Sequence, residues 1–218
     1  MSVIMLFIDT RISPPDKRWV ESVTVAGNTV VHIPALECVS TGISVNLDGF
    51  DAAFVASPRA AKLLSDELAH FKGLVWAVGK ATALTLRETG IPVSRVGDAS
   101  GAGTFFAQLV KELDGKLPVH RLAWIAAEET TENREEMSQV YGMEIVHFPV
   151  YRTVPTHPDF QTVSTLPKPR TWLFYSGKAV QSFKAYIDGA DGVELHGRSA
   201  AIAGANLLNA VIKPIAPE

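Results

Sequence analysis

Short, almost continuous apolar runs alternate along this 218-residue chain with longer stretches in which apolar residues recur every three or four positions. The short runs have the length and composition of strands that are covered on both faces. The longer stretches have the period of amphipathic helices. This alternation predicts an α/β fold with doubly wound parallel sheets. We expect strands at Val3–Ile8, Val30–Ile33, Ala53–Ala56, Val75–Val78, Leu122–Ala126, Ile145–Val150, Trp172–Tyr175 and Ala200–Ala203.

Helices are expected between these strands, at Arg59–His70, Ala81–Thr89, Thr104–Leu113 and Thr130–Val140. For the last of these, Thr130 or Thr131 is the expected N-cap in the acidic segment that precedes it. Gly142 stands where a glycine commonly ends a helix. The segment Thr156–Arg170 contains three prolines and predicts a loop.

One strand pattern is written twice. The sequence "VVHIP" at residues 30–34 returns as "IVHFP" at residues 145–149. Around these copies, the segment Asp51–Leu64 resembles Thr171–Phe183, each being an apolar run followed by Ser, a cation and an amphipathic stretch. Matches that keep their order indicate an internal duplication. The chain is therefore expected to form two similar α/β domains.

Composition excludes several classes of function. The net charge of −3 gives no global positive field, so neither nucleic acid nor a membrane is an expected partner. Cys38 is the single cysteine, which excludes an internal disulfide and a multi-thiolate metal site, and no His/Asp/Glu cluster has metal-ligand spacing. The opening residues lack the basic start of a secretory signal, and no apolar run approaches the roughly 20 residues that cross a bilayer. We expect a cytoplasmic protein without a metal.

Ligands of open parallel sheets bind beyond the carboxyl ends of the strands. In both halves of this chain, the loops expected there combine a small or hydroxyl residue with a cation at the start of a helix. Free N–H groups and the helix dipole make such loops suitable for anions. We therefore expect an anionic ligand held between two lobes. The candidate binding residues are Thr10, Arg11, Ser57, Arg59, Gly79, Lys80, Thr82, Ser100, Ser176, Gly177 and Lys178.

Tyr151 and Arg152 follow the repeated proline only in the second copy, and Leu36 stands in the place of Tyr151 in the first. Proline inside a strand favours an edge or connecting strand. Tyr151 is thus expected on a connector between the domains, where its phenol can donate a proton or a hydrogen bond to a leaving group. Arg152 is a further candidate for ligand binding. The paired residues His32 and His147 are interpreted as structural.

Taken in order, several segments resemble the uroporphyrinogen-III synthase family over most of the chain. They are "TR" at residues 10–11, "FVASPRAAKLL", "VWAVGKATALTLRETG", "NREEM", "FPVYRTVP", "LFYSGKAV" and "AAIAG". The resemblance implies two α/β domains joined by a two-stranded β connector, residues 30–39 and 145–153, with the active site in the cleft between the domains. Domain 1 would be discontinuous, residues 1–33 and 154–218, and domain 2 would be residues 40–146.

The resemblance also implies a reaction. The family cyclises hydroxymethylbilane, a linear tetrapyrrole with eight carboxylates, with inversion of the last ring and loss of water, and without a cofactor. It implies that Tyr151 assists departure of the hydroxyl group. We expect a monomer, with transfer of the bilane from the upstream deaminase as a further expectation. The chain departs from the family pattern at Ile202–Asn206, which lacks a usual threonine, and at Ala126-Ala127, where an arginine often follows the strand. The family's final helix would lie beyond Glu218.

Two other functions stay open at this stage. A non-catalytic two-lobed binding protein for an anionic metabolite fits the anion-binding loops, but it would not need Tyr151 and Arg152. A flavodoxin-like or nucleotide-sugar enzyme fits the fold class. However, the sequence contains neither GxxxxGK[ST] nor GxGxxG.

Overall fold

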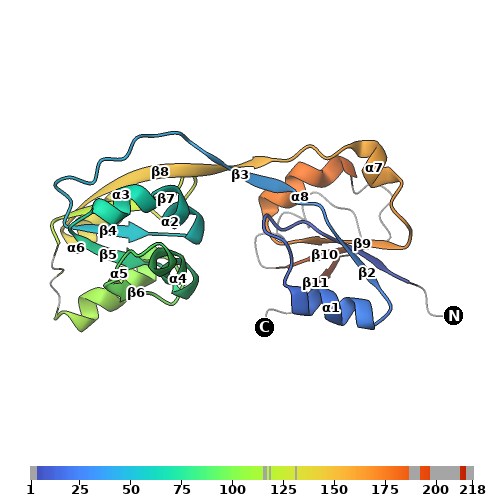
Figure 1. The fold of residues 1–218 in the computed structure, drawn as a ribbon, viewed down its shortest axis with the longest axis horizontal. Coiled ribbons are helices and arrows are strands. Elements are labelled where there is room, and N and C mark those ends of the chain that lie inside the picture. The colour runs from blue at the N-terminus through green and yellow to red at the C-terminus, as the bar shows by residue number, and fades with distance from the viewer. Residues whose placement is uncertain are drawn as a thin grey trace. The chain divides into compact units, whose positions relative to one another are not determined.

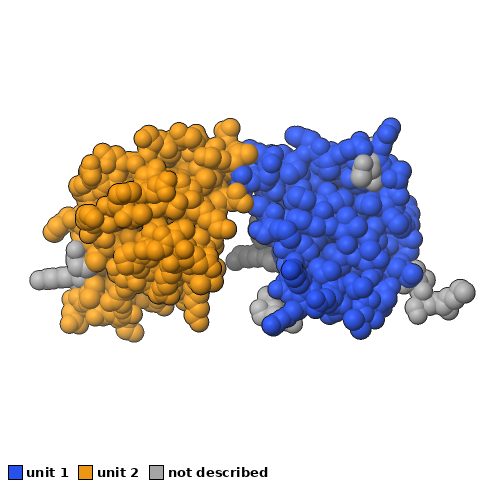
Figure 2. Space-filling model, in the orientation of Figure 1, with its two compact units in different colours: residues 1–38, 153–218 blue, residues 39–152 orange. Residues whose placement is uncertain are grey.

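The computed structural model describes residues 4–114, 117, 119–130, 132–186, 192–196 and 212–214. The chain forms two compact units (Figure 2): unit 1 comprises residues 1–38 and 153–218, and unit 2 comprises residues 39–152. Each unit combines a sheet of parallel strand pairs with helices (Figure 1), which confirms the predicted α/β class. The segments expected to connect the domains, 30–39 and 145–153, contain the points where the chain passes between the units.

In unit 1 the central strand is β1 (Leu6–Asp9). It pairs in parallel with β2 (Thr29–His32) on one side and with β9 (Arg170–Phe174) on the other. The full strand order is β11-β10-β9-β1-β2, with β10 at Gly192–Leu195 and β11 at Ile212–Pro214. Because the chain leaves β1 and β9 toward opposite edges, the carboxyl ends of these two strands are the expected place for a ligand. The helical elements are α1 (Lys17–Val25), α7 (Phe160–Ser164), α8 (Gly177–Phe183) and the 3-10 turn η1 (Lys184–Tyr186).

In unit 2 the sheet has the order β3-β8-β7-β4-β5-β6. The switch in strand order lies between β4 (Ala52–Val55) and β7 (Arg121–Ala127), which pair in parallel. The other strands are β3 (Leu36–Ser40), β5 (Leu74–Ala77), β6 (Arg95–Val96) and β8 (Glu144–Pro155). The helices are α2 (Pro58–Leu63), α3 (Ser65–His70), α4 (Lys80–Glu88), α5 (Ala102–Glu112) and α6 (Arg134–Tyr141).

Strand β4 shows why its sequence is apolar throughout. All four of its residues are buried, and successive side chains enter different cores. Ala53 and Val55 belong to the cluster that also holds buried residues of α2 and α4, whereas Ala52 and Phe54 belong to the cluster with those of α5. Both faces of the sheet are therefore covered by helices, as predicted from the continuous apolar runs.

Some predicted elements differ from the observed ones. The helix expected at Arg59–His70 is broken at Leu64, whose φ of −116° and ψ of 29° are not helical, so α2 and α3 are separate. Helix α6 begins at Arg134, because Asn133, not Thr130, accepts the capping hydrogen bond from Glu136 N at 3.2 Å. The helix-ending role of Gly142 is confirmed by its left-handed φ of 63°.

The segment predicted as a loop at Thr156–Arg170 contains the short helix α7. Strands β6, β10 and β11 were not predicted from the sequence. The strand expected at Ala200–Ala203, the loop Ile202–Asn206 and the alternative cap Thr131 lie outside the described residues.

The repeated His-Pro strands end in the same way in both units. His32 Nε2 donates to the carbonyl of Arg11 at 2.7 Å, and His147 Nε2 donates to the carbonyl of Ala127 at 2.9 Å. In each case the imidazole holds the loop that leaves the neighbouring strand, β1 or β7. The structural interpretation of both histidines is confirmed.

Candidate functional site

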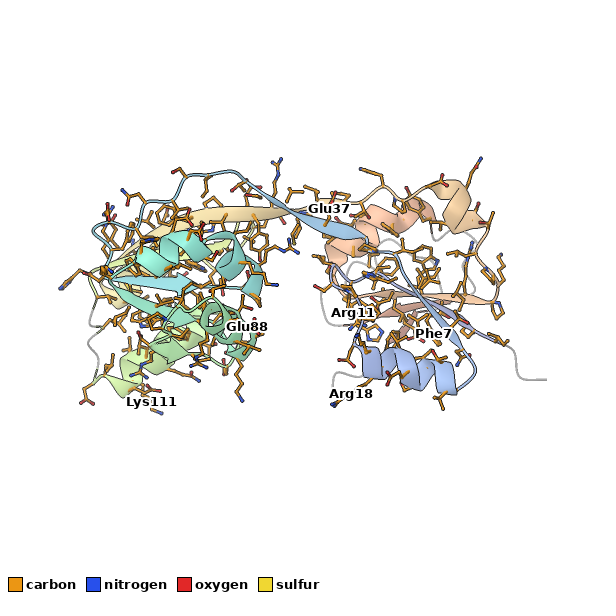
Figure 3. All side chains as sticks on the ribbon, in the orientation of Figure 1. Phe7, Arg11, Arg18, Glu37, Glu88 and Lys111 are labelled. Atoms are coloured by element: carbon orange, nitrogen blue, oxygen red, sulfur yellow. The ribbon has the colours of Figure 1, made fainter. Side chains whose placement is uncertain are left out.

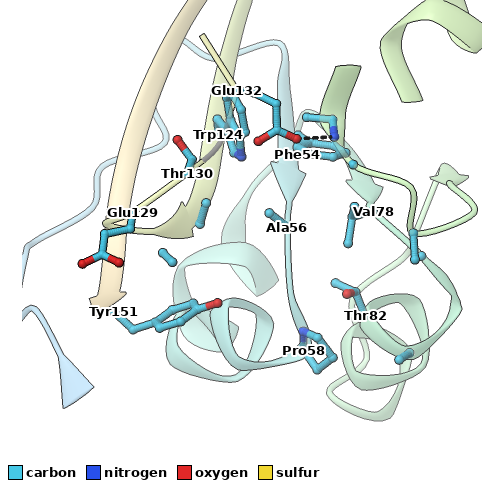
Figure 4. A pocket seen from close by; sticks show the side chains of 17 residues that line it. Phe54, Ala56, Pro58, Val78, Thr82, Trp124, Glu129, Thr130, Glu132 and Tyr151 are labelled. Carbon is cyan, nitrogen blue, oxygen red and sulfur yellow. Dashed lines mark hydrogen bonds between the residues drawn. The ribbon is translucent and has the colours of Figure 1, made fainter. Parts of the chain in front are cut away.

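A pocket of about 480 Å³ opens in unit 2 at the carboxyl ends of β4, β5 and β7 (Figure 4). This is the switch point of the unit 2 sheet, where ligands of such sheets bind. Its walls are mainly apolar and aromatic, and among the described lining residues there is no lysine or arginine. The lining residues are Phe54, Ala56, Pro58, Val78, Gly79, Ala81, Thr82, Ala99, Gly101, Ala102, Trp124, Ala126, Ala127, Glu129, Thr130, Glu132 and Tyr151.

Tyr151 reaches this pocket from β8, and its phenol points into it (Figure 4). The register of β7 and β8 shifts at this point: Ala126 pairs with Pro149, but Ala127 pairs with Tyr151. Pro149 has no N–H for the ladder, and such irregularities redirect the side chains beside them. The Tyr151 carbonyl accepts a hydrogen bond from Glu128 N at 2.8 Å, which holds its backbone in place.

The turn from β5 into α4 brings two predicted residues to the same pocket. Thr82 is 1% exposed and lines the pocket from the first turn of α4. Gly79 precedes this helix, and a Cβ atom there would lie 2.7 Å from the Cβ of Ala99. The two loops therefore pack closely only because residue 79 is glycine. Lys80 is exposed and is not among the lining residues.

Three other predicted residues of unit 2 lie beside the pocket lining. Ser57 caps α2 by accepting a hydrogen bond from Ala60 N at 3.1 Å, and its neighbour Pro58 lines the pocket. Arg59 is exposed. Ser100, also exposed, donates its hydroxyl and its N–H to the carboxylate of Asp98, and these bonds lower the pKa of Asp98.

Unit 1 has its own pocket, of about 520 Å³, at the carboxyl ends of β1, β9 and β10. Arg11 lines it, on the side of the sheet that carries α1 (Figure 3). Its guanidinium is ion-paired with the fully buried Asp9 at 2.8 Å, and the hydrogen bond to Asp9 raises the pKa of Arg11. The guanidinium carbon also lies 4.7 Å from the ring centroid of Tyr175 and 5.5 Å from that of Trp19. Arg11 is thus oriented by one carboxylate and two aromatic rings.

Asp9 receives a third donor in this pocket. The Tyr175 hydroxyl donates to Asp9 Oδ2 at 2.9 Å, and burial together with this bond raises the pKa of Tyr175. The Tyr175 ring stacks on His196 with a centroid distance of 4.8 Å. Because donors surround it, the Asp9 carboxylate is stabilised in its charged form.

The remaining predicted residues have local structural contacts or are exposed. Thr10 Oγ1 donates to the carbonyl of Leu173 at 2.7 Å and ties β1 to β9. Ser176 caps α8 by accepting a hydrogen bond from Ala179 N at 3.2 Å, and Gly177 is the buried first residue of that helix. Lys178 Nζ donates to the carbonyl of Thr153 at 2.9 Å. Arg152 is exposed on β8.

Of the predicted site residues, Gly79, Thr82 and Tyr151 line the unit 2 pocket, and Arg11 lines the unit 1 pocket. Sequence reasoning missed two polar lining residues, Trp124 and Glu132. A tryptophan in a strand buried on both faces was the available signal for the first, because its indole N–H needs a partner there. No local signal existed for Glu132, because its contact with Ala102 N spans 30 residues.

Within the described residues, no group of three or more His, Cys, Asp or Glu side chains could hold a metal ion. None of the helices in this part of the chain is long and apolar enough to cross a membrane.

Comparisons with known proteins were made for the sequence and for the fold. A family model described as uroporphyrinogen-III synthase HemD matches residues 17–211. The uroporphyrinogen-III synthetase structure from Helicobacter pylori aligns with a TM-score of 0.67 at 14% identity, over 96% of this chain and 92% of that chain. A mutant uroporphyrinogen III synthase from Thermus thermophilus aligns with a TM-score of 0.51 at 14% identity, over 97% of this chain and 91% of that chain. No curated protein matches the sequence.

Proposed function

The chain belongs to the uroporphyrinogen-III synthase family, and on this premise we propose that its reaction is centred on the unit 2 pocket, with Tyr151 as the catalytic residue. The family's place is the cyclising step of tetrapyrrole and haem biosynthesis, a lyase reaction. The substrate is hydroxymethylbilane, and the product is uroporphyrinogen III, in which the last ring has been inverted. The proposal requires no metal or organic cofactor.

One observation carries the proposal. The phenol of Tyr151 points into a largely apolar pocket at the switch point of the sheet, where the fold places ligands (Figure 4). The surrounding aromatic rings of Phe54 and Trp124 offer flat surfaces for a pyrrole. An apolar pocket with a few directed polar groups is the usual form of a small-molecule site, and its volume falls in the usual range of roughly 300–1,000 Å³.

The first chemical step is loss of the terminal hydroxyl group of the bilane. The C–O bond breaks, the ring nitrogen's electrons form the azafulvene, and the oxygen leaves as water once it has received a proton. Tyr151 donates that proton or a hydrogen bond to the leaving oxygen. The electrophilic carbon then forms the spiro-pyrrolenine with the substituted position of the last ring. Rearrangement and closure follow, and they give the inverted product without exchange of electrons with a cofactor.

The other predicted binding residues act, in this proposal, on the eight carboxylates. Thr82 and Gly79 belong to the same pocket as Tyr151, and Arg11 offers a pre-oriented cation at the corresponding edge of the unit 1 sheet. Ser57, Arg59, Lys80, Ser100, Arg152, Ser176, Gly177 and Lys178 remain candidate carboxylate contacts. A monomeric state, transfer from the deaminase and a cytoplasmic location also remain predictions. Sedimentation, coupled kinetics and cell fractionation would test them.

The test of this function supplies the protein with bilane made in situ by a deaminase and separates the product isomers. Uncatalysed closure gives the symmetric I isomer. A synthase yields the III isomer in excess, and we expect this result. If only the I isomer forms while the protein binds the bilane, the protein is the non-catalytic binding protein that the sequence left open.

A further inference from the structure

An indole N–H without a partner faces the unit 2 pocket. Trp124 is 1% exposed, and its Nε1 has no hydrogen-bond partner within the described part of the structure. Trp124 lines the pocket, and its nitrogen lies on the side of the ring that faces it (Figure 4). A buried donor that lacks an acceptor costs free energy, and the position of this one makes it available to a ligand.

A second donor in the same wall already holds a carboxylate. The first residue of α5, Ala102, is 2% exposed, and its N–H donates to Glu132 Oε1 at 3.1 Å (Figure 4). The N-cap of this 11-residue helix is Gly101, which supplies no side-chain cap. The positive end of α5 is therefore balanced by a carboxylate from 30 residues further along the chain.

Gly101 allows this carboxylate to approach. Its φ of +107° is strained for any residue with a Cβ, and a Cβ there would lie 2.9 Å from Glu132 Oε1. The backbone at the start of α5 thus leaves a space that a carboxylate oxygen fills. Both Glu132 and Trp124 line the pocket into which the Tyr151 phenol points.

We propose that the Trp124 indole N–H and the first turn of α5 form a subsite for one carboxylate of the ligand, and that Glu132 occupies this subsite in the ligand-free protein. Carboxylate oxygens accept several hydrogen bonds, so a ligand acid can use the indole donor as well as the helix N–H. The apolar rings beside these donors suit a pyrrole that carries the acid. The carboxylate class follows from the donors themselves, whereas the pyrrole rests on the proposed function.

The absence of basic side chains from the described pocket lining narrows the class of anion. Neutral N–H donors and one helix end can balance a single negative charge. A phosphate dianion would bring a second charge next to Glu129 and Glu132, and like charges at short range repel. The subsite is accordingly assigned to a monoanionic carboxylate group.

The first experiment uses ¹⁵N-labelled protein and follows the indole N–H signals during titration with a monopyrrole that carries two carboxylate side chains. Trp172 is a matched control, because it is also fully buried, and its Nε1 also has no partner among the described residues. It lies in unit 1, on β9. We expect the Trp124 signal to shift with saturation and the Trp172 signal to stay in place. Absence of binding, or binding that leaves the Trp124 signal unmoved, overturns the proposal.

The second experiment compares probe affinity among variants. Trp124→Phe keeps an aromatic ring but removes the donor, so the Kd for the probe should rise about tenfold, whereas Trp172→Phe should leave it within about twofold. Glu132→Gln keeps an acceptor for Ala102 N–H but removes the competing charge, so the Kd should fall about three- to tenfold. If Trp124→Phe does not fold, the wild-type titration and Glu132→Gln decide.

Glu129→Gln separates displacement from general repulsion. Glu129 lines the same pocket and carries the same charge, but it is exposed. We expect it to change the Kd by less than about twofold. Equal tightening by both variants, or no tightening by Glu132→Gln, contradicts the assignment of Glu132. Formation of the III isomer by a protein whose Trp124 signal ignores the probe rejects the subsite alone, whereas probe binding without the III isomer rejects the proposed function alone.

Discussion

At the scale of single residues, Thr82 and Thr85 provide a direct comparison. Both are buried and lie about one turn apart on α4, but only Thr82 lines the pocket. Thr85 Oγ1 donates to the carbonyl of Ala81 at 3.2 Å in the same helix. We predict that Thr82→Val, which keeps the shape, lowers kcat/KM about five- to tenfold by removing a hydroxyl from the site. Steady-state kinetics with bilane made in situ checks this. An equal loss in Thr85→Val would assign the effect to helix packing.

Arg11 is a second residue-scale case, because its guanidinium is paired with a fully buried carboxylate. We predict that Arg11→Met destabilises unit 1 by about 2–4 kcal/mol, since it leaves Asp9 buried without its counter-ion. The hydrogen bond from Tyr175 remains and keeps the loss below the upper end of the usual range. Denaturant unfolding followed by tryptophan fluorescence measures the change. The exposed Arg18 of α1 supplies the control Arg18→Met, expected within about 0.5 kcal/mol of wild type.

The residues show what the sequence could reveal about the site. Tyr151 was identified because it breaks the symmetry of a repeated strand, and the structure places it in a pocket. Arg11 was read as a free cation, although Asp9 two residues earlier is its partner. The contact between Glu132 and Ala102 could not be predicted, because it depends on how two loops 30 residues apart meet.

At the scale of elements, His147 on β8 holds the end of β7. Arg134 donates to its Nδ1 and its Nε2 donates to Ala127, so the imidazole must be neutral in this network. Burial, and then the charge of Arg134, hold the pKa of His147 below its ordinary value of 6.5. The neutral form is therefore favoured by folding. Above pH 6.5 both folded and unfolded states are neutral there, and as the pH falls below 6.5 the unfolded state binds a proton first.

We accordingly predict that unit 2 loses stability as the pH falls from about 7.5 to about 5.5, and that His147→Gln reduces this loss. Glutamine can accept from Arg134 and donate to Ala127 without titrating. Thermal unfolding at the two pH values measures the effect. The twin variant His32→Gln in unit 1 should leave it unchanged. An undiminished pH dependence in His147→Gln would contradict this account of the β8 end.

Most elements could be predicted because period and burial agree in them. Strand β4 reads as fully apolar, and it is buried on both sides. The break at Leu64 could not be predicted, because the apolar residues Leu64 and Leu68 are both buried and keep the helical spacing across it. The late start of α6 arises from a choice among several cap residues, and Asn133 was preferred over Thr130.

At the scale of the whole molecule, each unit has its own core. Trp172, Phe174 and Phe183 belong to the cluster of unit 1, whereas two clusters on opposite faces of the sheet form the core of unit 2. We predict two unfolding transitions. Arg11→Met should shift only one of them and His147→Gln, at low pH, only the other. Calorimetry of these variants tests it, and a single transition that both variants shift would contradict it.

The duplication predicted two similar bodies, but it could not predict which segments form each of them. Two sequential halves would repeat the same motifs. The pairing of β1 with β9, whose residues lie more than 160 positions apart, makes unit 1 discontinuous. That pairing is a non-local contact, and only the family resemblance indicated it before the structure did.

The central claim is that the Tyr151 phenol acts on the leaving hydroxyl group in the unit 2 pocket. Its most direct test is the rate of uroporphyrinogen III formation by Tyr151→Phe, with bilane made in situ at saturating concentration. Loss of general acid assistance should lower kcat about 100-fold. KM should stay within about threefold, because phenylalanine still fills the wall, and the III isomer should remain the product. A folded variant with the kcat of the wild type would contradict the claim.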